Sequence, residues 1–400
     1  MLFSLAQPAI LFPSTAKYRV FFWLATFTIL LFFVKKRSIG EEAIKLPQNK
    51  YIYAMLIVYT LSEAQFFWLE GTINVFLYWL KKVFLFYLVI NIAKDGKDLK
   101  RLMWCIIFAV IVLTFIGWDM YFNHPYLLVN EGRLQSVGNY NLSNSFALLL
   151  TLTFPLSFSL IEVEKSLLKK FVLLGLLIVF VISCIYTKSR GGTLGMIIGI
   201  NLCIILSVKL FKSKGLKIVI MGIVISMFIV YGLSIVLSRR HIEGYFGKGG
   251  EASSGDRLLA WVVAVRMFVD HPILGIGWEK YEETSRRYNY HKLGAHNTLL
   301  SVLAETGIIG FTCFVAILIL NFKQLWEMRQ HWRLIEDKQD LLILSQGVLI
   351  SLFCFLVNTS FSVKDHDPIY WAILTLSGVL CGIYLKEKNF NNELCSPKQA

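Results

Sequence analysis

One stretch of the 400-residue sequence decides the fold class: Ala295–Gly310, which reads AHNTLLSVLAETGIIG. Its apolar residues continue beyond the quoted stretch and form a run, Asn297–Leu320, that is long enough to cross a membrane as one helix. Two polar side chains are unexpected here: His296 directly precedes the run, and Glu305 lies about two turns inside it. The side of the membrane that this end faces therefore decides what the histidine can do.

The composition excludes a soluble globular protein. Hydrophobic residues make up 56% of the sequence, charged residues make up only 16%, and the mean hydropathy is +0.61. Apolar runs of roughly 18 or more residues recur along the whole chain, and each is long enough for a membrane-spanning helix. We therefore expect an all-α polytopic membrane protein.

Eleven apolar runs are clear, and Met1–Pro13 would make a twelfth if this short segment also crosses the membrane. The eleven runs are Tyr18–Val34, Tyr51–Trp68, Ile73–Ile92, Leu102–Phe122, Leu142–Ile161, Phe171–Thr187, Thr193–Leu210, Leu216–Leu237, Asn297–Leu320, Leu341–Val357 and Pro368–Leu385. The only long connection runs from residue 238 to residue 295. We divide the single integral domain into an N-terminal transmembrane bundle (1–237), a loop with short amphipathic helices (238–295) and C-terminal transmembrane helices (296–400).

Lysine and arginine alternate between the connections. Connections rich in these residues follow the odd-numbered runs, beginning with Lys35, Lys36 and Arg37, whereas the short connections between them carry few. The connection His124–Asn141, for example, contains only Arg133. The positive-inside rule places the rich connections in the cytoplasm. These loops account for the net charge of +14, and we expect no nucleic-acid partner.

The opposite face, which would be periplasmic, collects titratable residues from four separate segments. These are Lys188–Gly192, the loop 238–295, His296 and Val363–Asp367. The loop carries six arginines, but long loops cross the membrane regardless of their charge. For any one of these groups, a solvated loop position and a place in a functional site are both compatible with the sequence.

Arg190 lies in the tight turn Ser189-Arg190-Gly191-Gly192 between two spans. Two glycines let a backbone bend sharply and let a bulky ligand approach. A guanidinium presents a planar fork of donors that suits phosphate oxygens. We predict that Arg190 binds phosphate, and anchoring in lipid headgroups is its alternative role.

The long loop is expected to contain an amphipathic helix over Asp256–Asp270. Arg257 and Trp261 are four residues apart and share one face of this helix. Arg266 lies nine residues from Arg257, about half a turn away, so the two arginines cannot point into one cavity. We expect the helix to lie on or against the membrane with Arg257 directed inward, and a plain surface arginine is the alternative.

His296 stands at the start of a helix, where the helix dipole and the unpaired N–H groups disfavour an imidazolium. A neutral imidazole near pH 7 is what a general base requires. A histidine that caps its own helix or anchors in headgroups is the alternative. Further along the same helix, Gly307 and Gly310 are expected to be packing notches.

The charged residues Glu305, Lys81 and Lys82 lie inside membrane spans, where each needs a partner or a change of protonation. We expect Glu305 to pair with one of the two lysines. The outward loops lack the acidic pairs of divalent-metal sites, apart from Asp365 and Asp367, and no nucleotide-binding fingerprint occurs. We therefore expect no metal and no cofactor, and a chemistry that relies on two arginines and a histidine.

These residues resemble the O-antigen ligase family. The stretch His296-Asn297, nine residues and then Gly307-Ile308-Ile309-Gly310 is similar to the family's signature of His-Asn, nine residues and Gly-x-x-Gly. Three further stretches resemble its other motifs: Ser189–Gly192 its outward Arg-Gly turn, Arg257 with Trp261 and His271–Gly277 its loop pattern, and Gly138–Asn141 an upstream loop with asparagine. The resemblance covers most of the chain, including the number of spans and the position of the long loop.

The resemblance implies a glycosyltransferase, similar to the GT-C class, in the bacterial inner membrane with its site facing the periplasm. The donor would be a glycan on undecaprenyl pyrophosphate, and the acceptor would be a sugar hydroxyl of lipid A–core. Arg190 and Arg257 would stabilise the charge that develops on the pyrophosphate, and His296 would take the proton of the acceptor. One displacement with no enzyme intermediate predicts inversion at the anomeric carbon, and the reaction would need no metal.

The same resemblance implies further substrate contacts from Trp261, Asn297 and Asn141. It leaves alternatives open within the superfamily, which also contains O-antigen polymerases, whose acceptor is another lipid-linked repeat, and oligosaccharyltransferases that act on protein hydroxyls. A transporter of lipid-linked glycans could use the same arginines for binding alone. The two halves of the chain contain no matched pair of interrupted spans, which disfavours transport.

Overall fold

The chain is a helical membrane protein. The computed structural model describes residues 45–129, 132–210, 213–226, 254–288, 294–363 and 365–395, and all the regular structure in these ranges is helical. Seven helices in these ranges are long and apolar enough to cross a membrane, which confirms a multi-pass membrane protein. The expected spans at Met1–Pro13 and Tyr18–Val34, and the second half of Leu216–Leu237, lie outside the described residues.

The helices agree with the apolar runs to within a few residues at most ends. Their bounds are α6 Asn49–Ala64, α7 Leu69–Ile92, α8 Gly96–Asn123, α9 Ser143–Val163, α10 Leu167–Tyr186, α11 Arg190–Leu206, α13 Ser254–Asp270, α14 Tyr281–Tyr288, α15 Thr298–Arg333, α16 Gln339–Thr359 and α17 Pro368–Cys395. Short 3₁₀ turns occur at Pro125–Leu127, Gly138–Tyr140 and Glu336–Lys338. The largest difference is α15, which continues more than three turns beyond its apolar run into a polar segment.

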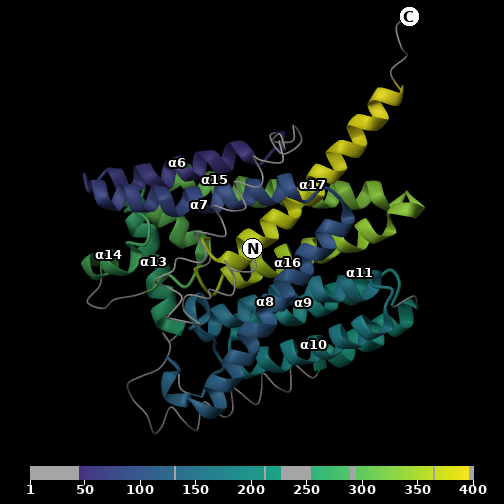
Figure 1. Cartoon of the computed structure of the whole chain (residues 1–400). Coiled ribbons are helices and arrows are strands. Elements are labelled where there is room, and N and C mark those ends of the chain that lie inside the picture. The colour runs from purple at the N-terminus through teal and green to yellow at the C-terminus, as the bar shows by residue number, and fades with distance from the viewer. Residues whose placement is uncertain are drawn as a thin grey trace, which may run out of the picture.

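The core of the bundle forms around α9. This helix is buried over the whole of its apolar window, and it packs against α8, α10, α11 and α16 (Figure 1). The outer helices α7 and α10 leave most of their apolar residues exposed, as expected of surfaces that face lipid. A second group of contacts joins α6 to α7 and α15, and α17 to α7 and α16. The sequence of α9 is therefore nearly all hydrophobic because other helices surround it. Only one side of α7 is buried because its other side lies at the surface of the bundle.

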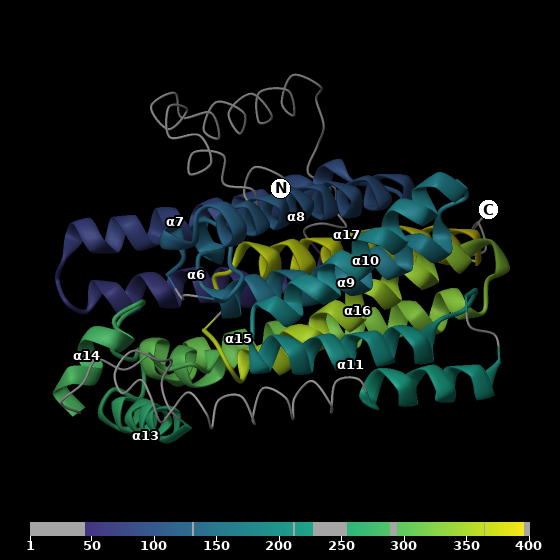
Figure 2. The ribbon, with the colours of Figure 1, turned by 90° about the horizontal axis from the view of Figure 1, so that it is seen from below.

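The connections alternate between two ends of the bundle because successive long helices run in opposite directions. Figure 2 shows the long helices side by side, with α13 and α14 at one end. The same end carries the short connections that precede α7, α9, α11 and α17, and the start of α15. We call it the site end, because Arg190, Arg257 and His296 all lie there; the lysine-rich connections lie at the other end.

The helix α15 is broken at Gly307, which adopts φ 63° and ψ −165°. The chain around residues 271–277 lies against this break. The N–H groups of Ile276 and Gly277 donate to the carbonyl oxygens of Ala304 (3.0 Å) and Glu305 (3.1 Å). In the other direction, the N–H of Ile308 donates to the carbonyl of Pro272 at 2.9 Å. The loop therefore supplies partners for the backbone groups that the break releases, as the membrane environment requires.

The structure bears out the expected packing notches at both glycines of α15 and adds the break at one of them. Gly307 is the break itself, because its backbone angles belong to a region that is essentially restricted to glycine. A Cβ at this position would also stand 2.3 Å from the carbonyl oxygen of Ile273. Gly310 does serve as a notch, since a Cβ there would approach a side-chain methyl of Val58 in α6 to 3.3 Å. Gly307 is therefore a packing notch for the segment that contains Ile273, as expected, and in addition it is the point at which the helix breaks.

We expect Gly307→Ala to destabilise the protein. The backbone conformation alone costs about 1–3 kcal/mol for a residue other than glycine, and the contact with Ile273 adds to this cost. The measurement is the thermal unfolding temperature and the monodisperse yield in detergent. Gly175→Ala in α10 is the matched control, because a Cβ at that position meets nothing within 4 Å. Equal unfolding temperatures for the two variants would contradict a strained break.

Candidate functional site

Arg190 is the first residue of α11, and its side chain is exposed at the site end. Ser189 caps the helix, because its hydroxyl accepts a hydrogen bond from the N–H of Gly192 at 3.2 Å. The two glycines do not make the sharp bend that the sequence suggests, since the left-handed residue of the turn is Lys188, with φ 51°. They permit close packing instead: a Cβ on Gly191 or Gly192 would stand 2.7 Å from Phe361 or 2.3 Å from Ala147.

Arg257 and Trp261 lie on one face of α13, which packs against α15. Both side chains are half-buried, and neither the Nε of Arg257 nor the indole N–H of Trp261 has a hydrogen-bond partner among the described residues. Arg266 is exposed, which agrees with the expected half-turn separation of the two arginines. Arg257 is therefore the arginine of α13 that is oriented towards the protein, with polar atoms that protein groups leave unsatisfied.

His296 and Asn297 have different local roles. Asn297 is the N-cap of α15, since its side-chain oxygen accepts from the N–H of Leu300 at 3.1 Å. His296 does not cap the helix; it has a left-handed backbone, with φ 48°, and a half-buried side chain. Gly294 lies beside this side chain. A Cβ added to Gly294 would stand 3.4 Å from Nε2 of His296 and 3.6 Å from a carboxylate oxygen of Glu282. The imidazole and a carboxylate of α14 thus both border the Cα of Gly294.

The connection between α16 and α17 brings the predicted residues into one region. Phe361 packs against Gly191, next to Arg190. The carbonyl of Ser362 accepts a hydrogen bond from the hydroxyl of Thr298, two residues after His296, at 2.6 Å. Val363 packs against a small hydrophobic cluster that contains Ala295 and three residues of α13, Val263, Ala264 and Met267. Three consecutive residues therefore contact Gly191 beside Arg190, Thr298 near His296, and the cluster that includes residues of α13.

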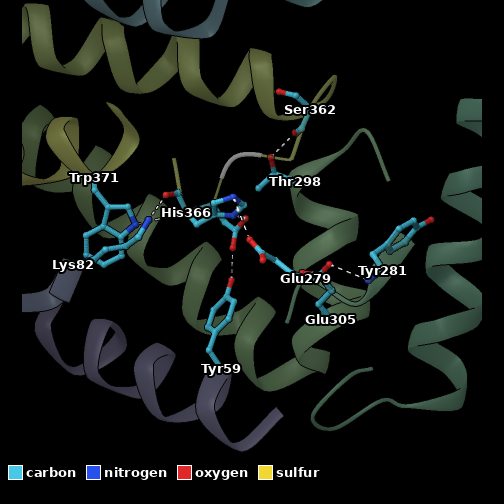
Figure 3. Close-up of polar contacts among 10 residues, drawn as sticks. Tyr59, Lys82, Glu279, Tyr281, Thr298, Glu305, Ser362, His366 and Trp371 are labelled. Atoms are coloured by element: carbon cyan, nitrogen blue, oxygen red, sulfur yellow. Dashed lines mark hydrogen bonds and ion pairs between the residues drawn. The ribbon is translucent and has the colours of Figure 1, made fainter. Parts of the chain in front are cut away.

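A polar cluster around the buried Asp365 holds the rest of this connection in place (Figure 3). Lys82, in the middle of α7, donates a hydrogen bond to the carbonyl of His366. The carboxylate of Asp365 accepts from the hydroxyl of Tyr59 at 2.7 Å and lies 3.2 Å from Nδ1 of His366. Nε2 of His366 lies 3.8 Å from the carboxylate of Glu279. A cation from a membrane span thus anchors a loop whose charged side chains are mutually paired.

Charge and burial act in opposite directions on the carboxylates of this cluster. Burial favours the neutral form of Asp365, but the hydrogen bond and charge of His366, with Tyr59 and Lys82, outweigh it and lower the pKa of Asp365 below its ordinary value. Burial raises the pKa of Glu279, against the opposing charge of His366. Asp365 is therefore held ionised, whereas Glu279 takes up a proton more readily than an exposed carboxyl would.

The expected pairing of Glu305 with Lys81 or Lys82 is wrong. Lys81 is exposed, and Lys82 contacts His366 and stacks over the rings of Tyr78 and Trp79, with its ammonium 4.6 Å and 5.6 Å from their centroids. The buried carboxylate of Glu305 instead accepts from the N–H of Tyr281 at 3.4 Å. Both charged groups thus support the site end, but separately.

Asn141 lies in the segment 132–142, which crosses the site end between α8 and α9, and its side chain is exposed. The segment is held at several points. Tyr140 donates to the carboxylate of Asp367 at 3.1 Å, and Ser136 donates to the carbonyl of Leu113 at 2.7 Å. Arg133 is buried in the same segment. Asn141 therefore shares the site end with Arg190 and His296, on a fixed segment.

Sequence reasoning missed the supporting role of Asp365, His366 and Asp367, which it treated only as a weak metal-ligand pattern. The useful signal was the combination of a lysine inside a span, Lys82, with acidic residues on an outward connection. Glu279 and Glu282 carried no such signal, because acidic residues in a long loop are usually solvated.

We expect Asp365→Asn to destabilise the protein near neutral pH by roughly 3–5 kcal/mol, because it removes one partner of a buried charged cluster. The pKa of Asp365 is lower in the folded protein than its ordinary value, so its contribution is present above the ordinary carboxyl pKa of about 4 and is lost as the pH falls through the folded value. The difference in unfolding temperature between wild type and variant should therefore shrink in acid.

The control for this substitution is Asp337→Asn, which changes an exposed aspartate at the other end of the bundle. Its unfolding temperature should equal that of wild type at every pH. A pH-independent effect of Asp365→Asn would show that shape, and not charge, is what the cluster requires.

Comparison with known sequences agrees with the motifs. The profile of the family described as O-Antigen ligase matches residues 173–315, from the second turn of α10 to the middle of α15, and this segment contains Arg190, Arg257 and His296. No curated protein sequence matches the chain closely enough to count as a relative. The chain is a multi-pass membrane protein, and its residues 173–315 are similar to the O-antigen ligase family.

Proposed function

We propose that the protein is an O-antigen ligase that transfers a glycan from undecaprenyl pyrophosphate to a sugar hydroxyl of lipid A–core. Similarity to this family supports transfer of the ligase or polymerase type on lipid-linked glycans. The observation that carries the proposal is that the connection Phe361–Val363 contacts the start of α11, the start of α15 and a cluster with residues of α13, the three helix segments that would supply the chemistry. Two guanidinium groups can stabilise a leaving pyrophosphate, and one imidazole can act as the base.

In the proposed reaction, the acceptor hydroxyl attacks the anomeric carbon while the bond from that carbon to the pyrophosphate oxygen breaks. Negative charge develops on the leaving pyrophosphate, and Arg190 and Arg257 stabilise it by charge-assisted hydrogen bonds. Arg190 is exposed at a helix start, and Arg257 has an Nε without a described partner, so both are available to a ligand. These two cations make the proposed reaction independent of a metal.

His296 takes the proton of the attacking hydroxyl. Its place before the first turn of α15 favours the neutral imidazole that a base requires. The nearby carboxylate of Glu282 would stabilise the imidazolium that forms in the reaction. Because no enzyme-linked intermediate is formed, the configuration at the anomeric carbon inverts. Trp261, Asn141 and the free part of the Asn297 amide are the proposed substrate contacts.

The proposed location of the site is the periplasmic face of the bacterial inner membrane. The alternation of lysine-rich and lysine-poor connections supports this orientation, because Arg190, Arg257 and His296 all lie opposite the lysine-rich end. The apolar outer face of α13, with Leu258, Val262 and Val269 exposed, suits contact with the outer leaflet in which a lipid-linked donor would lie.

We expect Arg190→Ala, Arg257→Ala and His296→Ala each to lower the rate of glycan transfer about a hundred- to a thousandfold, because each removes a group that acts mainly in the transition state. The measurement is transfer by purified protein in detergent from a lipid-linked oligosaccharide to rough lipopolysaccharide. Arg266→Ala is the matched control: this arginine is exposed on the opposite side of α13, and its loss should change the rate less than severalfold. A comparable loss at Arg266 would contradict the assigned orientation of α13.

A deletion strain distinguishes the ligase from the polymerase. If the protein is the ligase, lipid A–core should lose all polymer while polymer accumulates on the lipid carrier. Single repeats that remain attached to the core would instead identify a polymerase. Purified protein that binds both substrates but forms no glycosidic bond would favour transport.

A further inference from the structure

We infer that Arg133 is a positioning residue that holds Arg190 in place for the reaction. Arg133 lies in the segment 132–142, far from α11 in the sequence, and only 8% of its surface is exposed. The inference rests on the proposed function, because it assigns a role relative to Arg190. Its substance is a chain of hydrogen bonds from the buried guanidinium to the residue that precedes Arg190.

The first link joins Arg133 to the end of α10. Its Nε donates to the carbonyl of Thr187 at 2.8 Å, and its terminal nitrogen donates to the side-chain oxygen of Asn144 at 3.3 Å. Beside it, the N–H of Leu134 donates to the carbonyl of Tyr186 at 2.9 Å. The segment therefore occupies two carbonyl groups at the end of α10, and it is tied to the first turn of α9 at the same time.

The second link joins Thr187 to the start of α11. The hydroxyl of Thr187 accepts from the N–H of Ser189 at 3.2 Å, and the hydroxyl of Ser189 accepts from the N–H of Gly192. Between them Lys188 has a left-handed backbone, which costs a lysine about 1–2 kcal/mol and persists only where its neighbours hold it. Two residues linked by a hydrogen bond thus separate the Arg133 guanidinium from Arg190.

Electrostatics explains why this place carries an arginine. The carbonyl groups at a helix end bear partial negative charge, and a cation there stabilises the helix. A guanidinium can also reach two acceptors in different directions, which a lysine ammonium on a flexible stem does less well. A buried charge is costly without such partners, so the two acceptors suit an arginine at position 133 better than any other side chain.

The inference predicts a specific kinetic pattern. Arg133→Gln should loosen the turn and misplace the Arg190 guanidinium, which lowers kcat about ten- to a hundredfold with little change in KM. Arg133→Lys, which keeps the charge but not the double contact, should recover only part of kcat. Asn144→Ser removes one acceptor and should give a smaller loss. Arg101→Gln is the matched control, since this arginine is exposed at the other end of the bundle.

The decisive measurement is a double-mutant cycle with Arg190. The four proteins are wild type, Arg133→Gln, Arg190→Ala and the double variant, assayed with a polyprenyl-pyrophosphate-linked oligosaccharide and rough lipopolysaccharide. If Arg133 acts through Arg190, its substitution should cost less than about twofold once Arg190 is absent. An equal cost in both backgrounds, or wild-type kcat for both Arg133 variants, would overturn the inference.

Unfolding temperatures of all variants in detergent separate positioning from general instability. If Arg133→Gln does not fold, the cycle is measured with Asn144→Ser, which keeps the Arg133 guanidinium but removes one of its two acceptors. Failure of the proposed function looks different: wild type would then form no glycan–core product, or Arg190→Ala would retain full activity. Wild-type activity, loss at Arg190 and no loss at Arg133 or Asn144 would refute the positioning role alone.

Discussion

The arrangement of the site end depends on one buried cation. Lys82 lies in the middle of α7, where a charge is stable only with close partners, and those partners are the carbonyl of His366 and the carboxylates around it. They all belong to, or contact, the short connection between α16 and α17. That connection contacts the start of α11, the start of α15 and the small cluster of α13. Fixing it therefore fixes the three elements that carry the predicted chemistry.

A second constraint comes from the backbone. A helix can break inside a membrane protein only where other groups take over its hydrogen bonds, and the break at Gly307 meets this condition through the returning loop 271–277. The loop is thereby held against α15 close to the point where Glu305 is buried. Its two neighbours along the chain, α13 and α14, carry Arg257 and Glu282. A glycine in the signature thus positions residues that are distant from it in sequence.

Much of this protein could be predicted from the sequence. Hydropathy gave the spans, because a helix in lipid must satisfy its own backbone and present apolar side chains. Helical periodicity separated Arg257 from Arg266, since nine residues make two and a half turns. The motifs around His296 and Arg190 indicated the family whose profile matches residues 173–315. These inferences need only local geometry and composition.

Other features could not be predicted, because they depend on contacts between distant segments. The partner of Lys82 is a carbonyl on a loop 284 residues away, and nothing in the sequence marks a carbonyl as an acceptor. Arg133 resembled a stray loop arginine until the chain brought it to the end of α10. The sequence by itself determined a helical membrane protein with its reactive residue types on one face. The tertiary structure decided which charges pair, because pairing inside a membrane depends on distance and burial and not on order along the chain.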